Sequence, residues 1–347
     1  MLRSILPLFP AACYPGTVAE GLMTKLRIGV IGAGYFGRFH TLKVAGNPRA
    51  LLSGVFDADP ERAALVAKEA GGVAAGSVEA LIAASDAIVI AAPAEAHFEI
   101  AREALAAGRH VLVEKPIAAT VEQADTLAEL AAAQGKVLQV GHLLRYTAEH
   151  KAISDRITRP LYIEATRIAP FKPRGTDVSV ILDLMIHDLD LVLSLVPAEI
   201  DYVDAMGAAV SSNLEDIANA RVRFKNGCVA TITASRISLK TERKMRIFSE
   251  EGYLSADFGA RALVMIGRER GMPLPGTDGF RRETIGWTDH DAMQAEHVAF
   301  TASILDGAPV LVDAHAGRRA LAAAIAVTDA IRKSREVAEA SGLIRRK

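Results

Sequence analysis

Residues 26–37 read LRIGVIGAGYFG, and this segment decides the fold of the N-terminal half. Its first six residues are largely apolar, as expected for a strand of a parallel sheet that is covered on both faces. A glycine-rich turn comes next, then a helical stretch, and Asp57 stands about 20 residues beyond the last glycine. Strand, turn, helix and acid together match the dinucleotide-binding fingerprint, whereas the glycines alone would be weak evidence.

Each part of this fingerprint has an expected contact with the cofactor. The glycines let the backbone turn tightly, and the N–H groups at the start of the next helix bind the pyrophosphate. Asp57 is expected to hold the adenosine ribose and to repel a 2′-phosphate, which favours NAD over NADP, although neighbouring arginines can override one aspartate. The alternative is a structural turn with a chance acidic residue. The predicted cofactor-binding residues here are Gly32, Gly34, Tyr35, Phe36, Gly37 and Asp57.

Strand-like and helix-like segments alternate through the first half, which predicts a doubly wound parallel sheet with right-handed crossovers. The expected strands after the first are residues 51–56, 86–93, 110–113 and 137–141. The expected helices are residues 61–70, 97–107 and 120–134.

Length and composition set further limits. A chain of 347 residues suits two domains, and its net charge of −1 gives no electrostatic support for a nucleic-acid partner. The two cysteines, Cys13 and Cys228, are far apart, which fits a reducing, cytoplasmic location and argues against a thiolate metal site. No apolar stretch approaches the roughly 20 residues of a membrane span.

The first 22 residues differ in pattern from the rest of the chain. One basic residue precedes a short apolar run that two prolines break, so a secretory signal is one interpretation. Met23 directly precedes the first strand, and we therefore expect residues 1–22 to be a disordered extension or to lie upstream of the translated start.

A second motif, Glu114-Lys115-Pro116, ends the fourth expected strand. With Ala92-Pro93 followed by His97, with residues 139–145 (QVGHLLR), and with Asp183 four residues before His187, it resembles the Gfo/Idh/MocA oxidoreductase family. The resemblance runs from residue 23 to about residue 334. It places a further set of residues beside the cofactor: Ala92, Pro93, His97, Glu114 and Lys115.

The resemblance implies a second domain built on an open, mainly antiparallel sheet, which often pairs subunits into a homodimer or homotetramer. The sequence agrees, because two strand-like runs flank Asn226-Gly227, a strong hairpin signal. We expect a Rossmann domain at residues 23–145, an α+β domain at 146–335 and a charged, disordered tail at 336–347. The other strands expected in the second domain are 161–169, 200–210, 243–249 and 262–266, and helices at 290–305 and 314–332 are expected to pack back on the Rossmann domain.

Three residues are predicted to be catalytic. The resemblance makes Lys115 a positioner of the reacting hydroxyl and a stabiliser of developing alkoxide; otherwise it would be a surface lysine before a turn. Asp183 and His187 have the spacing of one helix face, which predicts His187 as general base and Asp183 as partner of both. The alternative is that the two residues lie on a solvated helix face. Asp188 and Asp190 belong to that face unless they cap or brace the helix. Family members divide the base role between lysine and histidine, and no third ligand supports a metal.

The substrate prediction rests on resemblance to one branch of the family. The GHLLRY segment and the LDLMIHDLD run look most like relatives that oxidise C3 of UDP-N-acetylglucosamine, upstream of an aminotransferase in lipid A or surface polysaccharide synthesis. Cations on segments expected at the cleft suit a diphosphate, although solvated loop charge is the alternative. The predicted substrate-binding residues are His142, Arg145, Lys172 and Arg174. The other possibilities are an inositol or aldose dehydrogenase, an NAD-dependent glycosidase and a non-catalytic NAD-binding regulator.

Overall fold

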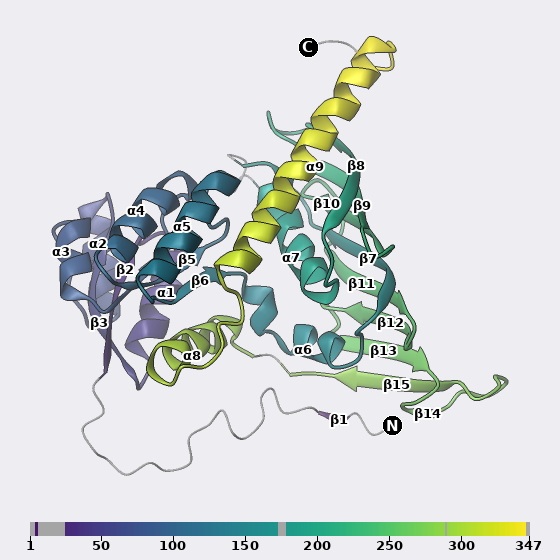
Figure 1. Ribbon diagram of the computed structural model, residues 1–347, viewed down its shortest axis with the longest axis horizontal. Helices are drawn as coiled ribbons and strands as arrows, with labels where there is room; N and C mark the ends of the chain where they lie inside the picture. The colour runs from purple at the N-terminus through teal and green to yellow at the C-terminus, as the bar shows by residue number, and fades with distance from the viewer. Residues whose placement is uncertain (1–3, 6–24, 173–177, 289, 345–347) are drawn as a thin grey trace. The chain divides into compact units, whose positions relative to one another are not determined.

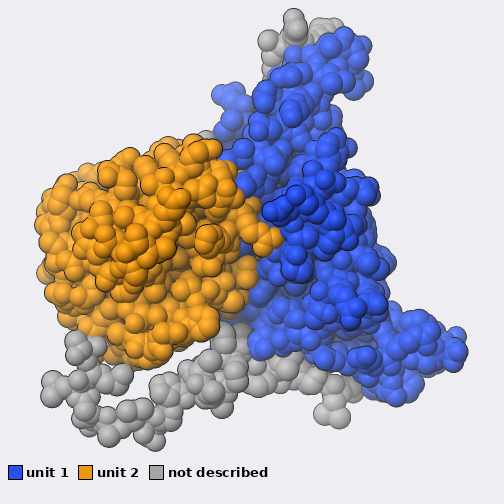
Figure 2. Space-filling view, in the orientation of Figure 1, with its two compact units in different colours: residues 1–8, 147–290, 322–347 blue, residues 9–146, 291–321 orange. Residues whose placement is uncertain are grey.

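The computed structural model describes residues 4–5, 25–172, 178–288 and 290–344. The chain divides into two compact units (Figure 2). Unit 2 holds residues 9–146 and 291–321, and unit 1 holds residues 1–8, 147–290 and 322–347. Among the described residues, no helix combines the length and apolar composition that crossing a membrane requires.

Unit 2 contains a five-stranded sheet in which all neighbouring strands are parallel, in the order β3-β2-β4-β5-β6 (Figure 1). The predicted doubly wound sheet is confirmed. Its strands are β2 (Leu26–Ile31), β3 (Ala50–Phe56), β4 (Ala87–Ile90), β5 (His110–Glu114) and β6 (Leu138–Gly141). Its helices are α1 (Tyr35–Ala45), α2 (Pro60–Glu69), α3 (Val78–Ala84), α4 (Ala94–Ala106), α5 (Val121–Ala133), the 3-10 turn η2 (Leu143–Tyr146) and α8 (Ala292–Leu305).

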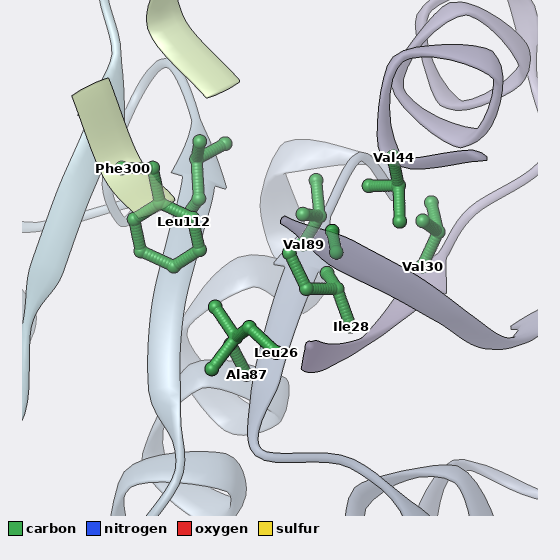
Figure 3. Packing of buried hydrophobic residues seen from close by; sticks show 9 residues of the cluster. Leu26, Ile28, Val30, Val44, Ala87, Val89, Leu112 and Phe300 are labelled. Atoms are coloured by element: carbon green, nitrogen blue, oxygen red, sulfur yellow. The ribbon is translucent and has the colours of Figure 1, made fainter. Parts of the chain in front are cut away.

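The core of unit 2 joins segments that are far apart in the sequence. Val44 of α1, Leu112 of β5 and Phe300 of α8 pack in one cluster with apolar residues of β2 and β4, and each of these three is fully buried (Figure 3). Burying one such side chain stabilises the fold by about 1.5–3 kcal/mol. The cluster therefore fixes α1 and α8 against the sheet.

Unit 1 is built on one large sheet, in the order β1-β15-β13-β12-β11-β7-β10-β9-β8, with β14 paired to β15. All neighbours are antiparallel except β7 with β10 and β1 with β15, so the predicted, mainly antiparallel sheet is confirmed. The hairpin at Asn226-Gly227 joins β9 and β10, and Gly227 supplies the positive φ that such a turn requires. The strands are β1 (Ser4–Ile5), β7 (Pro160–Ile168), β8 (Ile200–Ala208), β9 (Ile217–Phe224), β10 (Val229–Ser235), β11 (Glu242–Ser249), β12 (Gly252–Asp257), β13 (Ala262–Gly267), β14 (Met272–Pro273) and β15 (Arg281–Gly286).

The helices of this half differ from prediction in three places, of which the first is α6 (Ala148–Ser154), a helix that was not predicted. The segment expected to be a regular helix around Asp183 begins as a π-helix, η3 (Ile181–Met185), and continues as α7 (Ile186–Leu195). Helix α9 (Ala314–Ala340) runs past the predicted end into the supposed tail. Arg335 bonds Glu339 one turn ahead, and Ala338 is buried, which explains the extension.

A buried carboxylate ties the start of the π-helix to the sheet of unit 1. Asp216 accepts backbone N–H bonds from residues 210–212 and a 2.8 Å bond from Nε of Arg236. Arg236 also donates to the carbonyl of Val178 at 2.7 Å, just before the π-helix. Burial alone would raise the pKa of Asp216, but Arg236 and the three N–H donors lower it far below its ordinary value.

Asp216→Asn is expected to lower the free energy of unfolding by about 3–5 kcal/mol at neutral pH, because it removes the buried carboxylate charge that Arg236 neutralises. The folded-state pKa of Asp216 is depressed, so its contribution is complete above the unfolded pKa and is lost as pH falls toward the folded value. Urea unfolding at pH 7 and below about pH 4 tests this, and the deficit should shrink in acid. Asp204→Asn, at an exposed position of β8, is the control. A deficit that is equal at both pH values would contradict the assignment.

Candidate functional site

Four of the predicted cofactor-binding residues and one predicted substrate-binding residue lie along one edge of the parallel sheet. Each comes after the carboxyl end of a different strand, and the sheet order arranges them in a row. The chain passes from β2 to β3 on one side and later returns to β4 on the other, so the strand order reverses at β2. Open α/β sheets bind their ligands at such a point. In sheet order the row is Asp57, Gly32, Ala92, Lys115 and His142.

The glycine turn after β2 has the shape that a pyrophosphate requires. Gly32 has a φ of +96°, and a Cβ there would lie 2.5 Å from the carbonyl of Ala91. A Cβ on Gly37 would lie 1.8 Å from the Gly32 oxygen, so α1 packs directly on the turn. Gly34 is the N-cap of α1, has open space around its Cβ position and supplies no side chain to bond the first-turn N–H groups. These features fit a dinucleotide phosphate.

Two aromatic residues begin α1 beside this turn. Tyr35 and Phe36 are 59% and 42% exposed, and their rings meet edge to face. Large exposed apolar side chains next to an anion-binding turn are available to cover a bound ligand.

Asp57 stands at the end of β3, where it both shapes the turn and offers a charge. Its carboxylate accepts the N–H of Ala33 at 2.6 Å and that of Asp59 at 2.8 Å, and Arg62 donates to it at 2.8 Å. Burial raises the pKa of Asp57, but these three donors outweigh burial and lower it. The carboxylate is therefore ionised at neutral pH.

His97 and Glu114 do not have the exposed positions expected of cofactor contacts. His97 is 1% exposed, and its two ring nitrogens lie 2.7 Å from the carbonyl of Pro116 and 2.9 Å from that of Ala92. It braces the turn after β4 against the Lys115-Pro116 turn. Glu114 is largely buried and bonds the Nε2 of His40 at 2.8 Å. Both residues support the segments that carry the site.

The predicted substrate-binding residues are divided between the units. His142, in unit 2, is 1% exposed, and Arg145 lies close behind it in the 3-10 turn, where its guanidinium reaches the carbonyl of Leu311 at 3.5 Å. Lys172, in unit 1, is exposed, and Arg174 lies outside the described residues.

In unit 1, Asp183 lies in the π-helix and His187 in the first turn of α7, and both are half-buried. Single π turns inside α-helices occur frequently at functional sites. The next residue, Asp188, is 1% exposed and forms a two-pronged ion pair with Arg167 of β7, at 2.7 and 2.9 Å. Asp188 therefore braces α7 against the sheet, which is one of the two roles predicted for this residue.

Arg243 is a cation that the sequence did not reveal. It pairs in register with Arg167, so both side chains project from the sheet face on which α7 packs. Arg167 is neutralised by Asp188, whereas no carboxylate among the described residues forms an ion pair with Arg243. Desolvation, and after it repulsion from Arg167, lowers the pKa of Arg243, and its side chain still reaches solvent. Arg243 lies beside the end of β7 that residues 169–172 follow. A cation at this position suits an anionic ligand.

Within the described ranges, no group of three or more His, Cys, Asp or Glu side chains is arranged to hold an ion.

Comparison with known proteins agrees with the geometry. The model of the oxidoreductase family with an NAD-binding Rossmann fold matches residues 26–142, and the C-terminal domain model of the same family matches residues 154–255. The chain belongs to the Gfo/Idh/MocA oxidoreductase family. It is 44% identical over 313 residues to UDP-N-acetylglucosamine 3-dehydrogenase from Acidithiobacillus ferrooxidans, covering 89% of this chain and 98% of that protein.

Solved structures give the same result. A structure of the Acidithiobacillus ferrooxidans enzyme superposes with a TM-score of 0.83 at 43% identity, over 89% of this chain and 98% of that one. An inositol 2-dehydrogenase from Rhizobium meliloti is 26% identical over 90% of this chain and 98% of its own length. Scyllo-inositol dehydrogenase from Lactobacillus casei, solved with NAD(H) and scyllo-inositol, shares the fold at 22% identity and a TM-score of 0.75, over 89% of this chain and 98% of that one. The predicted family and enzyme class are confirmed.

Gly37→Ala is expected to weaken NAD binding at least tenfold, because the new methyl group must push α1 away from the Gly32 carbonyl. Titration calorimetry with NAD, with urea unfolding alongside, measures both consequences. Gly76→Ala, whose Cβ meets nothing within 4 Å, is the matched control. Unchanged NAD affinity in Gly37→Ala would show that contact between α1 and the turn does not shape the cofactor site.

Proposed function

We propose that this protein is an NAD-dependent dehydrogenase that oxidises the C3 hydroxyl of UDP-N-acetylglucosamine to a 3-keto nucleotide sugar. The observation that carries the proposal is the 44% identity to an enzyme of that name across nearly the full length of both chains. The ketone is the kind of product that an aminotransferase consumes, and it would serve amino-sugar synthesis for lipid A or a surface polysaccharide. The enzyme would work in the cytoplasm as a homodimer or homotetramer.

Three side chains have roles in the proposed reaction. The nicotinamide of bound NAD supplies the hydride acceptor. Lys115 donates a hydrogen bond to the reacting hydroxyl and stabilises negative charge as it develops on oxygen. His187 takes the hydroxyl proton, as a neutral imidazole can near pH 7. Asp183 acts as the partner of both His187 and Lys115.

The preference for NAD over NADP results from the charge at the end of β3. Asp57 is ionised and points one carboxylate oxygen at the glycine turn, where a 2′-phosphate would be repelled. Arg62, the cation that could attract such a phosphate, is already bonded to Asp57. The aspartate therefore sets the preference.

A nucleotide sugar differs from a free polyol by its diphosphate, and unit 1 offers that group a cation. Arg243 carries a charge that Arg167 repels more strongly than Asp188 attracts it, and no described carboxylate forms an ion pair with it. An Arg–phosphate contact is charge-assisted and often two-pronged, so a bound diphosphate would compensate this charge. We propose that Lys172, which is exposed and follows the same end of β7, adds a second positive charge.

An inositol dehydrogenase is the second candidate, and relatives with that name support it. A free polyol carries no phosphate, so it would leave Arg243 with only the attraction of Asp188, which already pairs with Arg167. Competition by UDP therefore separates the two candidates.

Incubation with NAD+, UDP-N-acetylglucosamine and hydroxylamine, read by mass spectrometry, tests the proposed reaction. The trap is required because alcohol oxidation by NAD+ is often uphill. We expect a ketone product in the wild type and a rate that is lower by roughly 10²–10³ in Lys115→Met, because an electrostatic contact to the oxyanion is lost. Lys68→Met, at an exposed position of α2, is the control. NADH formed from inositol but not from the nucleotide sugar would reject the substrate assignment.

Arg243→Met is expected to raise KM for the nucleotide sugar about tenfold or more with little change in kcat, because it removes uniform binding. It should also weaken inhibition by UDP. Arg246→Met, on the opposite face of the same strand, is the matched control. If KM and UDP inhibition are the same in both variants, Arg243 does not contact the diphosphate.

A further inference from the structure

Four titratable side chains form a buried cluster in unit 2: His40, Glu114, Glu296 and His297, which we call the acid–imidazole network. They come from α1, β5 and α8, and three of the four are fully excluded from solvent while Glu114 is 9% exposed. None of them belongs to the dinucleotide turn or to the residues proposed to touch substrate. Burying this many ionisable groups is costly unless they have partners or a role.

The apolar core next to the acid–imidazole network determines where the side chains of the network lie. His40 lies one helical turn before Val44 on α1, and Glu296 lies one turn before Phe300 on α8. Glu114 lies two residues beyond Leu112, on the same side of β5. Since Val44, Leu112 and Phe300 share one cluster (Figure 3), the same helix and strand periods bring the polar residues together next to it.

The bonds within the network run in one direction. His40 Nε2 lies 2.8 Å from a Glu114 carboxylate oxygen, and His40 Nδ1 lies 2.9 Å from Nε2 of His297. A neutral His40 that donates from Nε2 must accept at Nδ1, so His297 donates from its Nε2. Burial is the main cause that lowers the pKa of His297, and the charge of Lys43 adds to it, in agreement with a neutral ring.

The two carboxyl groups have opposite surroundings. Glu114 accepts a hydrogen bond from His40 and, at 3.2 Å, one from the backbone N–H of Lys115. Burial raises the pKa of Glu114, but the effects of His40 and Lys115 are larger and lower it below its ordinary value. Neither carboxyl oxygen of Glu296 has a partner among the described residues. Burial, and then repulsion from Glu114, raises the pKa of Glu296 well above its ordinary value.

We propose that Glu296 carries a proton in the working protein, so that the acid–imidazole network holds one negative charge, on Glu114, and that this charge positions Lys115. The proposal rests on the proposed function for the role of Lys115. The Glu114 carboxylate fixes the N–H of Lys115, and with it the point from which the lysine side chain departs. Gly141 makes this possible, because a Cβ there would lie 3.1 Å from the same carboxylate oxygen.

Charged and titratable groups face Glu296 from each element packed around it. Its own helix contributes His297, α1 contributes His40 and Lys43, β5 contributes Glu114 and the adjoining Lys115, and η2, which packs on α8, carries Arg145. From β6, Gln139 is uncharged and bonds the Glu296 backbone carbonyl at 3.4 Å. A second ionised carboxylate would face Glu114 across this buried space, so ionisation of Glu296 should disturb the network.

The protonation state can be tested without substrate. Infrared difference spectra at neutral pH should show the carbonyl stretch of a protonated carboxylic acid in the wild type that is absent in Glu296→Gln. A folded pKa raised above the unfolded value of 4.5 makes the wild type lose stability as pH rises above that value. Glu296→Gln should therefore become progressively more stable than the wild type from about pH 5 upward. Absence of the infrared band, or a stability difference that does not grow with pH, would overturn the proposal.

The positioning role needs a kinetic measurement. Glu114→Gln should lower kcat about tenfold or more while KM changes less than about threefold, because alignment is lost and binding is kept. In Glu296→Gln the alkaline limb of the kcat profile should move upward by about one pH unit. Glu129→Gln, on the exposed face of α5, is the control for both. Equal effects on kcat and KM in Glu114→Gln, or an unmoved alkaline limb in Glu296→Gln, would reject positioning. If the nucleotide sugar proves to be the wrong substrate, the infrared and stability results still decide the protonation state.

Discussion

The close approach of Gly37 to the Gly32 carbonyl is the constraint on which unit 2 depends. No side chain can stand between them, so α1 starts directly on the turn after β2. Because α1 begins at this point, its first-turn N–H groups lie at the carboxyl edge of the sheet. The same contact fixes the position of α1 along β2. Val44 then reaches the core, and His40 comes within hydrogen-bonding distance of Glu114. One contact between two glycines thus determines both the phosphate turn and the support behind Lys115.

The parts of the fold that were predicted have local signals. Strand, glycine turn, helix and Asp57 are contiguous, and the hairpin at Asn226-Gly227 is a short-range signal as well. The acid–imidazole network has no such signal, because His40 and His297 are 257 residues apart and only the fold brings them together. A trace existed nonetheless: Glu296 and His297 lie in an otherwise apolar part of α8, where polar residues require an explanation.

Other errors have equally specific causes. The same apolar residues can form either a π-helix or an α-helix. Their spacing therefore could not show that η3, around Asp183, departs from a regular α-helix. Arg243 looked like an ordinary charge in a strand, because its meaning depends on Arg167 being opposite and on Asp188 being occupied. Helix α9 was predicted too short because a charged sequence was interpreted as a tail, whereas its charges pair along the helix. Spacing within a short segment cannot show backbone hydrogen bonds or partners on another strand, and these decide each case.

The two units manage buried charge in different ways. In unit 1 the buried carboxylates of Asp188 and Asp216 each face an arginine, so charge is neutralised by charge and the helix start is locked. In unit 2 the acid–imidazole network is built from carboxyl and imidazole groups, and the proposed proton on Glu296, with His40 and His297 both neutral, leaves a total of one negative charge. Arginine pairs resist a rise in pH, because guanidinium does not lose its proton in proteins. A proton on a carboxyl group can be lost, so the charge of the network beside Lys115 depends on pH. A site that releases a proton with every oxidation is where such a dependence has consequences for rate.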